Sequence, residues 1–402
     1  MISVAEAIRI VEEQSTHLPV ESVVLAEARG RFLAEDIIAD SDLPPFDRSQ
    51  MDGYAVRAAD IENPPVQLRI VGESAAGNGW HREMKAGEAV RIMTGAPLPA
   101  GADSVQQVEL TRDLSPTLVE IQKTVSVGRS VVKRGSEVKS GATVLSAGEQ
   151  INPAMLATLA SFGYAQVKVG KKPRVAVLAT GSELVSVDQQ PGKDQIRDSN
   201  NYSIGSYAEL AGAVVEGLPL AGDDVALLKQ QIEEAAARSD VVVTSGGVSM
   251  GVYDFTKAAL IELGCEIFFE RVALRPGKPT VFARLPNRTL VFGLPGNPVS
   301  VSVTFNLFAR SALLQLQGAR NPRLQEQNAI LGRDVKGSEE RESYLPASLR
   351  TDTEGRLIAE PLKWGGSSDF VAFTRATALI IIAAGVGKQS AGRVVKVVNL
   401  PE

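Results

Sequence analysis

The sequence predicts a multidomain α/β plus β protein, and three observations carry this prediction. The chain has 402 residues, which at roughly 100–200 residues per domain is enough for two to four domains. Between about residue 173 and residue 321, apolar runs alternate with helical patterns, which indicates a doubly wound, mostly parallel sheet with helices on both faces. On either side of this segment, short β-branched runs separated by glycine and proline turns indicate β-rich domains.

The composition excludes several classes of protein. Hydrophobic residues make up 44% and charged residues 22%, which argues against wholesale disorder and against a disulfide-stapled miniprotein. A net charge of −5 argues against a general nucleic-acid-binding surface. The single Cys265 cannot form an internal disulfide, and two histidines leave little material for a zinc site. Since neither a secretory signal nor a membrane-spanning run is evident, we expect a cytoplasmic protein with no nucleic-acid or membrane partner.

The N-terminal part begins with an amphipathic helix over residues 3–16. Ser3 is the expected N-cap because Glu6 follows at the capping-box spacing, and Val4, Ala7 and Val11 recur at helical spacing. From about residue 52 to residue 150, strand-like runs at 66–71, 89–93 and 118–125 alternate with turn signals. A short helix is expected at 152–162, with Pro153 in its first turn.

The segment from residue 173 reads as repeated βαβ units. Strands are expected at 175–179, 214–218, 241–244, 266–272, 280–284 and 290–292, and helices at 202–211, 225–237, 255–263 and 299–316. After Pro322 the pattern is again strand-like, at 329–331, 343–349, 357–360, 370–373, 378–382 and 394–398. These short strands indicate a small β domain of barrel type.

Three strands of the α/β segment end in turns that suit an anion. Thr180-Gly181-Ser182-Glu183 follows the first strand, residues 245–251 follow the strand at 241–244, and residues 293–298 follow the strand at 290–292. Ligands of an open parallel sheet lie outside the carboxyl ends of its strands, where glycines let backbone N–H groups approach a phosphate. One such loop is as consistent with an ordinary tight turn, but three on one edge favour a binding site.

The same edge should carry charge of both signs. Arg275 and Lys278 lie three residues apart in a stiff turn and suit an oxyanion. Glu183, Asp223 and Asp254 supply carboxylates, and carboxylates beside a phosphate suggest a bridging divalent cation. The structural alternative is that Asp254 caps the helix at 255, and that Asp223 or Asp224 caps the helix at 225.

Taken together, the motifs resemble the molybdopterin molybdenumtransferase family, the bacterial MoeA type that also occurs as the E domain of gephyrin. The resemblance covers essentially the whole chain. Six motifs carry it: FDRSQMDGYA at 46–55, IMTGAPLPAGAD at 92–103, IRDSN at 196–200, SGGVSMG at 245–251, RPGKP at 275–279 and LPGNP at 294–298.

The resemblance implies four domains, an elongated homodimer and a specific reaction. The implied domains are a discontinuous N-terminal helix and linker domain (1–43 and 141–172), a β-rich domain (44–140), a molybdopterin-binding α/β domain (173–321) and a C-terminal β-barrel (322–402). The implied reaction is magnesium-dependent hydrolysis of adenylylated molybdopterin, with insertion of molybdenum from molybdate and release of AMP. The molybdopterin adenylyltransferase and molybdoenzyme maturation factors are implied as partners.

The resemblance also implies roles for individual residues. The residues implied to hold the pterin and the phosphates are Thr180, Gly181, Ser182, Asp198, Ser199, Asn200, Ser245, Gly246, Gly247, Ser249, Gly251, Pro295, Gly296, Asn297 and Pro298. The implied catalytic residues are Asp52, Thr94, Glu137, Glu183, Asp223 and Asp254, of which Glu183, Asp223 and Asp254 bind the metal, while Asp52 and Thr94 arrive from the partner subunit. The molybdate ligands are expected to be Arg275, Lys278, Arg341 and Ser367.

Two positions depart from the family pattern, and a third places a negative charge near a predicted oxyanion ligand. Glu137 stands where the family commonly has Asp, Arg275 replaces a frequent Lys, and Asp369 lies near Ser367, where it would repel an oxyanion unless it points away. Two alternatives to the enzyme remain: a non-catalytic, gephyrin-like binding scaffold, and an enzyme of other chemistry on the same α/β fold, such as a nucleotide amide hydrolase.

Overall fold

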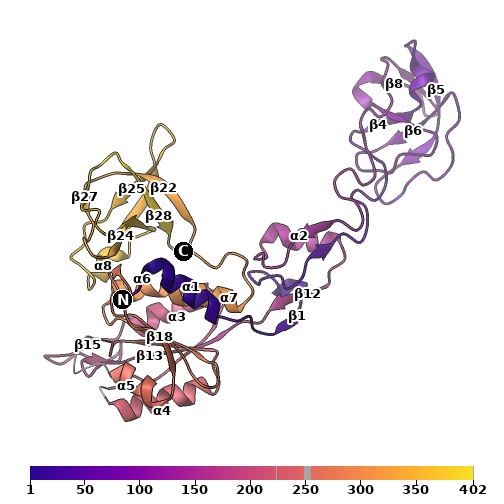
Figure 1. Cartoon of the computed structure of the whole chain (residues 1–402). Coiled ribbons are helices and arrows are strands. Elements are labelled where there is room, and N and C mark those ends of the chain that lie inside the picture. Colours follow the sequence, from indigo (N-terminus) through magenta and orange to yellow (C-terminus); the bar gives the residue numbers. More distant parts are fainter. Residues whose placement is uncertain (223, 249–254, 402) are drawn as a thin grey trace. The chain divides into compact units, whose positions relative to one another are not determined.

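The computed structural model describes residues 1–222, 224–248 and 255–401 (Figure 1). The chain folds as two compact units. The larger unit comprises Met1–Glu35, Ala147–Pro153 and Gln166–Glu402, and the smaller unit comprises Asp36–Ser146 and Ala154–Ala165. The finer division into four domains stays a prediction.

A six-stranded sheet forms the centre of the larger unit. Its order is β16 (Val214–Gly217), β13 (Arg174–Ala179), β17 (Val241–Ser245), β21 (Leu290–Leu294), β20 (Val281–Arg284) and β18 (Glu266–Phe269). The first four strands are parallel, whereas β20 and β18 are joined by antiparallel pairings. The prediction of a mostly parallel sheet is therefore confirmed.

Helices cover both faces of this sheet, as Figure 1 shows. Successive side chains of a strand point to opposite faces, so Val175 and Val177 join one core while Ala176 and Leu178 join the other. The first core also contains side chains of α1 (Val4–Gln14), α3 (Asn200–Leu210), α6 (Pro298–Thr304) and α7 (Arg310–Leu316). The second core is covered by α4 (Val225–Ala236) and α5 (Phe255–Glu262).

The N-terminal helix begins where the sequence predicts. The Ser3 hydroxyl accepts a hydrogen bond from Glu6 N at 3.1 Å, and Val4, Ala7 and Val11 are buried in the first core. The capping hydroxyl and the apolar stripe thus fix where α1 starts and which face it buries.

The helix expected at 299–316 is interrupted by a π-helical turn, η4 (Phe305–Ala309), between α6 and α7. Together these elements form the one helix of the described residues that is long and apolar enough to cross a membrane, over Pro298–Leu316, and 89% of it is buried inside the protein. Its apolar character is accounted for by packing in the first core.

A closed five-stranded barrel forms the C-terminal part. Its strands run in the order β24 (Glu342–Thr351), β25 (Leu357–Pro361), β22 (Glu326–Leu331), β28 (Val394–Asn399) and β26 (Ala378–Ile382), and β26 pairs with β24 to close the ring. The short strand β19 (Leu274–Arg275) adds to β24, and β23 (Val335–Lys336) pairs with β27 (Lys388–Gln389). The barrel prediction is confirmed.

The strand expected at 370–373 is wrong, because these residues form the short helix α8 (Phe370–Phe373). The Asp369 carboxylate accepts hydrogen bonds from Ala372 N at 3.2 Å and Gly365 N at 2.8 Å. This cap stabilises a helical turn where the apolar run alone suggested an extended segment. Phe373 is buried, whereas Phe370 remains half-exposed.

The smaller unit is β-rich, as the sequence predicts. Its sheet has the order β7 (Ser104–Gln107), β4 (Gly53–Val56), β6 (Glu88–Ile92), β5 (Val66–Ser74), β9 (Leu118–Ile121) and β8 (Thr111–Ser115). The further elements of this part of the chain are β2 (Ile37–Ile38), β3 (Arg48–Ser49), β10 (Val131–Val132), β11 (Thr143–Leu145) and α2 (Pro153–Ser161). The pair β1 (Val20–Val24) and β12 (Gln166–Gly170) belongs to the larger unit.

Candidate functional site

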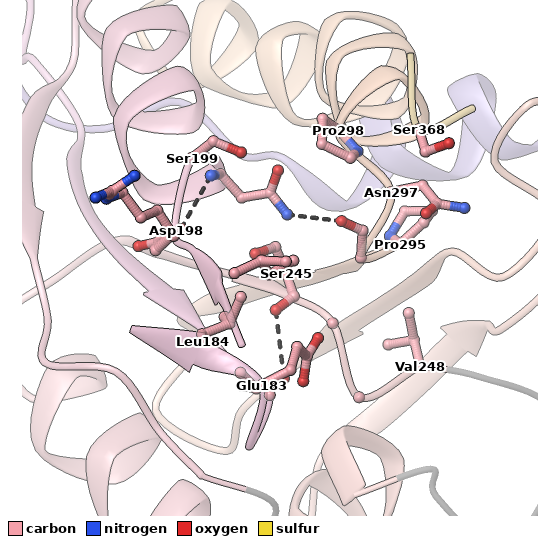
Figure 2. A pocket seen from close by; sticks show the side chains of 18 of the residues that line it. Glu183, Leu184, Asp198, Ser199, Ser245, Val248, Pro295, Asn297, Pro298 and Ser368 are labelled. Atoms are coloured by element: carbon pink, nitrogen blue, oxygen red, sulfur yellow. Dashed lines mark hydrogen bonds between the residues drawn. The ribbon is translucent and has the colours of Figure 1, made fainter. Parts of the chain in front are cut away.

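The three glycine-bearing loops meet at one edge of the large sheet. Because β13, β17 and β21 are adjacent and parallel, their carboxyl ends lie side by side. The loops that follow them line a cavity of about 920 Å³ (Figure 2), a size suited to a cofactor-sized ligand. The site residues expected from the sequence that line it are Thr180, Gly181, Glu183, Asp198, Ser199, Asn200, Ser245, Gly246, Gly247, Pro295, Gly296, Asn297 and Pro298.

The other expected residues of this site are not among those that the structure places at the cavity. Ser182 is not among the described residues that line this cavity. Ser249, Gly251, Asp223 and Asp254 lie outside the described residues.

The floor of the cavity requires a glycine at position 246. Gly246 has a φ of +90°, and a Cβ atom added there would lie 2.3 Å from the Thr180 carbonyl oxygen. Thr180 N donates to Ser245 O at 2.8 Å and Gly246 N donates to Leu294 O at 3.1 Å. The three loops are therefore joined backbone to backbone, with no room for a side chain between them.

The segment that follows β15 (Ile196–Arg197) is fastened to the same floor. The buried Asp198 carboxylate accepts hydrogen bonds from Asn200 N at 3.0 Å and Asn201 N at 3.2 Å, at the start of α3. The Asn200 side-chain amide then donates to Gly296 O at 2.8 Å, and Figure 2 shows this segment beside the loop that contains Pro295. Asp198 thus holds Asn200 in place, and Asn200 bridges two walls of the cavity.

Two polar atoms of the cavity wall have no partner in the described part of the chain. Ser245 Oγ and Asn200 Oδ1 are both buried, and neither atom has a hydrogen-bond partner among the described residues. Buried polar atoms are satisfied in the great majority of cases, so an unpaired hydroxyl and an unpaired amide oxygen at a cavity fit a ligand with polar edges. Figure 2 shows Ser245 at the centre of the site.

Of the three predicted metal ligands, Glu183 is the one that lies within the described residues. Figure 2 shows its side chain below Ser245, and a Cβ atom at Gly181 would lie 2.5 Å from Glu183 Oε2. Within the described ranges there is no group of three or more His, Cys, Asp or Glu side chains that could hold a metal ion. Glu183 can therefore supply one oxygen ligand of the kind Mg²⁺ prefers, and the other expected ligands fall on residues that are not described.

Asp224 has the structural role considered as the alternative. Its carboxylate accepts hydrogen bonds from Ala226 N at 2.8 Å and Leu227 N at 3.1 Å, and so caps α4.

A second cavity, of about 680 Å³, adjoins the first and collects the four predicted molybdate ligands Arg275, Lys278, Arg341 and Ser367. The two cavities share Pro279, Pro295 and Asn297 in their walls. The Asn297 side-chain amide donates to Ser367 Oγ at 2.9 Å. This hydrogen bond joins the loop that follows β21 to the segment that precedes α8.

Arg275 lies in the same cavity wall as Pro295 and Asn297, which follow β21, but it is brought there by the barrel rather than by a strand of the large sheet. The chain leaves that sheet after Phe269, and Arg275 lies in β19, where it pairs with Ser343 of β24 in the barrel. Pairing with the barrel thus places the guanidinium-bearing turn beside the sheet edge rather than on it.

The second cavity is strongly cationic. Lys336 also lines it, and the sequence offered no motif that would have singled out this residue. Among the described residues that line the cavity, the one carboxylate is that of Asp334, which forms an ion pair with Lys388 at 2.6 Å. An oxyanion is the ligand that such an excess of guanidinium and ammonium groups favours.

Asp369 is not among the described residues that line this cavity. Its carboxylate bonds to Gly365 N and Ala372 N, and these backbone hydrogen bonds lower the pKa of Asp369. The Asp369 carboxylate therefore serves as the N-cap of α8.

The remaining predicted residues belong to the smaller unit. Asp52 Oδ1 accepts hydrogen bonds from Thr94 N at 2.7 Å and Thr94 Oγ1 at 3.0 Å, and these bonds hold the pKa of Asp52 below its usual value. Glu137 forms an ion pair with Arg48 at 3.2 Å. Thr94 thus donates two hydrogen bonds to the Asp52 carboxylate and favours its ionised form.

Comparisons with known proteins identify the α/β domain first. Residues 176–315 match the family model described as "Probable molybdopterin binding domain", so the larger unit carries a domain of that family. Residues 2–163 match the MoeA N-terminal region (domain I and II), and residues 328–400 match the MoeA C-terminal region (domain IV). The chain belongs to the molybdopterin molybdenumtransferase (MoeA) family.

Full-length relatives support this assignment. The molybdopterin molybdenumtransferase of Bacillus subtilis (strain 168) is 36% identical over 411 residues, covering 100% of this chain and 94% of that protein. The one from Haemophilus influenzae is 37% identical over 381 residues, covering 94% of this chain and 93% of that protein. A crystal structure of the molybdopterin biosynthesis MoeA protein of Pyrococcus horikoshii superposes with a TM-score of 0.83 at 33% identity, over 99% of each chain.

Proposed function

We propose that the chain is a molybdopterin molybdenumtransferase that acts on adenylylated molybdopterin and molybdate. The observation that carries this proposal is the adjacency of two different cavities that share Asn297. The first cavity is the larger of the two and is lined by glycine-bearing loops, which suit a phosphate-bearing ligand. The second cavity is lined by cationic side chains, which suit a tetrahedral dianion.

The first cavity takes the organic substrate. Backbone N–H groups of the loops after β13, β17 and β21 hold the phosphates, while Ser245 Oγ and Asn200 Oδ1 bond to polar edges of the ligand. The second cavity takes molybdate, with Arg275, Lys278, Arg341 and Ser367 as donors. Because Asn297 is in the wall of both cavities, we propose that the oxyanion binds next to the end of the organic substrate that receives the metal.

The reaction is hydrolysis coupled to metal insertion. A water oxygen attacks phosphorus and the phosphoanhydride bond breaks, which gives AMP and molybdopterin phosphate. Two Mo–S bonds then form between molybdate and the dithiolene sulfurs, while one oxo ligand of molybdate leaves as water with the two thiol protons, so that the oxidation state of molybdenum does not change. Bound Mg²⁺ would neutralise negative charge on the phosphates. Glu183, Asp223 and Asp254 are proposed as its ligands, and Asp254 in addition as a hydrolytic residue.

The protein is proposed to act as a cytoplasmic homodimer. Asp52, Thr94 and Glu137 belong to the smaller unit, and we propose that Asp52 and Thr94 of one subunit complete the site of the other. The ionised Asp52, held by Thr94, then supplies a fixed negative charge near the metal and the phosphates. The substrate is supplied by an adenylyltransferase acting on molybdopterin.

The test is an assay of the purified protein with adenylylated molybdopterin, Mg²⁺ and molybdate, in which AMP release is followed by chromatography and cofactor by reconstitution of an apo-molybdoenzyme. We expect both products, and loss of AMP release in Asp254→Ala with no change in thermal unfolding. Absence of AMP and of active cofactor with the unaltered protein would contradict the proposal and leave a binding scaffold as the function.

A further inference from the structure

One aromatic side chain that lines the first cavity, Phe370, is not part of either hydrophobic core of the α/β sheet. Phe370 lines the cavity and is 49% exposed, although it comes from α8 beside the barrel rather than from the α/β sheet. Phe255, the other phenylalanine among the described lining residues, packs against the core formed with α4 and α5. Phe373, one turn after Phe370, is buried in the first core.

Phe370 is held at the cavity by the residues just before it. Ser367 O accepts a hydrogen bond from Val299 N at 3.0 Å, and Ser367 Oγ accepts one from Asn297. Asp369 caps α8 through Ala372 N. Figure 2 shows Ser368 beside Pro298 and Asn297, so the segment that carries Phe370 reaches the wall of the site. The backbone that carries the exposed ring is therefore held at the wall of the cavity.

We propose that Phe370 is the platform on which the pterin ring of the substrate stacks. The inference rests on the proposed function and deepens it, because a flat heteroaromatic ring gains dispersion and quadrupole attraction on an aromatic face. A half-exposed phenylalanine beside loops rich in glycine and proline supplies that face without disturbing a core.

The position of Phe370 selects the pterin rather than the adenine of the substrate. Phe370 lies three residues from Ser367, which lines the cationic cavity. The dithiolene sulfurs must face that cavity to receive molybdenum, and the pterin is fused to the ring that bears them. The adenine lies beyond two phosphates, and thus at the far end of the ligand.

The proposal is tested by equilibrium titration with a stable fluorescent probe, 6-hydroxymethylpterin phosphate, and in parallel with AMP. Stacking of a base on an aromatic ring, removed by alanine, corresponds to roughly a 5- to 150-fold change in affinity. We expect Phe370→Ala to weaken binding of the pterin phosphate within that range and to leave AMP binding unchanged. Phe370→Tyr should restore affinity, and Phe370→Trp should both restore it and quench the pterin emission, which requires ring contact.

Val371→Ala is the matched control, because Val371 lies on the same helix, is 68% exposed and is absent from the described lining of both cavities. Thermal unfolding of each variant verifies the fold, and Phe370→Leu replaces the alanine variant if α8 is lost. Pterin phosphate affinity equal in Phe370→Ala and the unaltered protein would overturn the platform while leaving the proposed function intact. A loss confined to AMP would assign the ring to adenine and also overturn it. Failure of the unaltered protein to bind the pterin phosphate would count against both proposals.

Discussion

Replacing Gly246 with alanine should disrupt the floor of the first cavity. The new Cβ would lie 2.3 Å from the Thr180 carbonyl oxygen, in a residue whose φ is +90°. The surrounding backbone has little freedom to yield, since Thr180 N is bonded to Ser245 O and Gly246 N to Leu294 O. The loops after β13 and β17 must therefore move apart.

The expected destabilisation follows from two costs. A left-handed backbone conformation costs an L-residue roughly 1–2 kcal/mol. Forcing an extra carbon into a closely packed site costs typically about 1–3 kcal/mol. Their sum, roughly 2–5 kcal/mol, is a large fraction of the stability of an ordinary domain. Because the displaced backbone forms the cavity floor, affinity for the pterin phosphate should fall as well.

Urea unfolding followed by far-UV circular dichroism measures the effect on stability, and titration with the pterin phosphate measures the effect on the site. Gly217→Ala is the matched control, because Gly217 ends the exposed strand β16, and a Cβ atom added there meets nothing within 4 Å. This control should be neutral or slightly stabilising, since Ala costs less conformational entropy than Gly in a strand. If Gly246→Ala unfolds at the same urea concentration as Gly217→Ala, the reasoning from close approach is refuted.

Three further predictions concern individual contacts. Thr94→Val removes the hydroxyl bond to Asp52 but keeps the backbone bond, so the pKa of Asp52, measured by carbon-13 NMR, should rise part of the way towards its ordinary value. Because that pKa is lowered in the fold, the stabilisation it gives is present above the unfolded value near 3.8 and is lost as pH falls through the folded value. Arg341→Gln should weaken molybdate binding roughly 10- to 150-fold in calorimetry, as the loss of a charge-assisted hydrogen bond implies. Asn200→Ala should lower the free energy of unfolding by about 1–3 kcal/mol in urea, because the Gly296 carbonyl loses its 2.8 Å partner.

Each of these predictions has a clear opposite. An Asp52 pKa unchanged in Thr94→Val would mean that the hydroxyl bond does not stabilise the carboxylate. Molybdate affinity retained in Arg341→Gln would remove Arg341 from the oxyanion site, with Arg333→Gln as the control, since Arg333 pairs with Glu360 and is absent from the described lining of that cavity. Unaltered unfolding of Asn200→Ala would show that the bridge between the two loops contributes no stability.

Much of the α/β domain could be predicted because its signals are local. Continuous apolar runs mark β13 and β17 as strands buried on both faces, and glycines after them mark the loops. Since adjacent parallel strands place their carboxyl ends together, the meeting of Thr180, Ser245 and Pro295 follows once the strands are recognised.

The parts that could not be predicted depend on contacts between distant segments or on a choice between local structures. Nothing near Arg275 in the sequence signals that β19 pairs with β24, about seventy residues later. The apolar run at 370–373 is compatible with either a strand or a helix, and the Asp369 cap decides in favour of the helix. Lys336 and Phe370 line cavities without belonging to a motif, and only the folded chain reveals them.

The most direct test of the account is an anomalous difference map, collected at the molybdenum absorption edge, from crystals of the protein soaked with molybdate and Mg²⁺. We expect a molybdenum peak in the second cavity, with oxyanion atoms within hydrogen-bonding distance of Lys278, Arg341 and Ser367. A map with no peak there, or with molybdenum bound at another surface, would contradict the claim that the two adjoining cavities bring the pterin ligand and the oxyanion together.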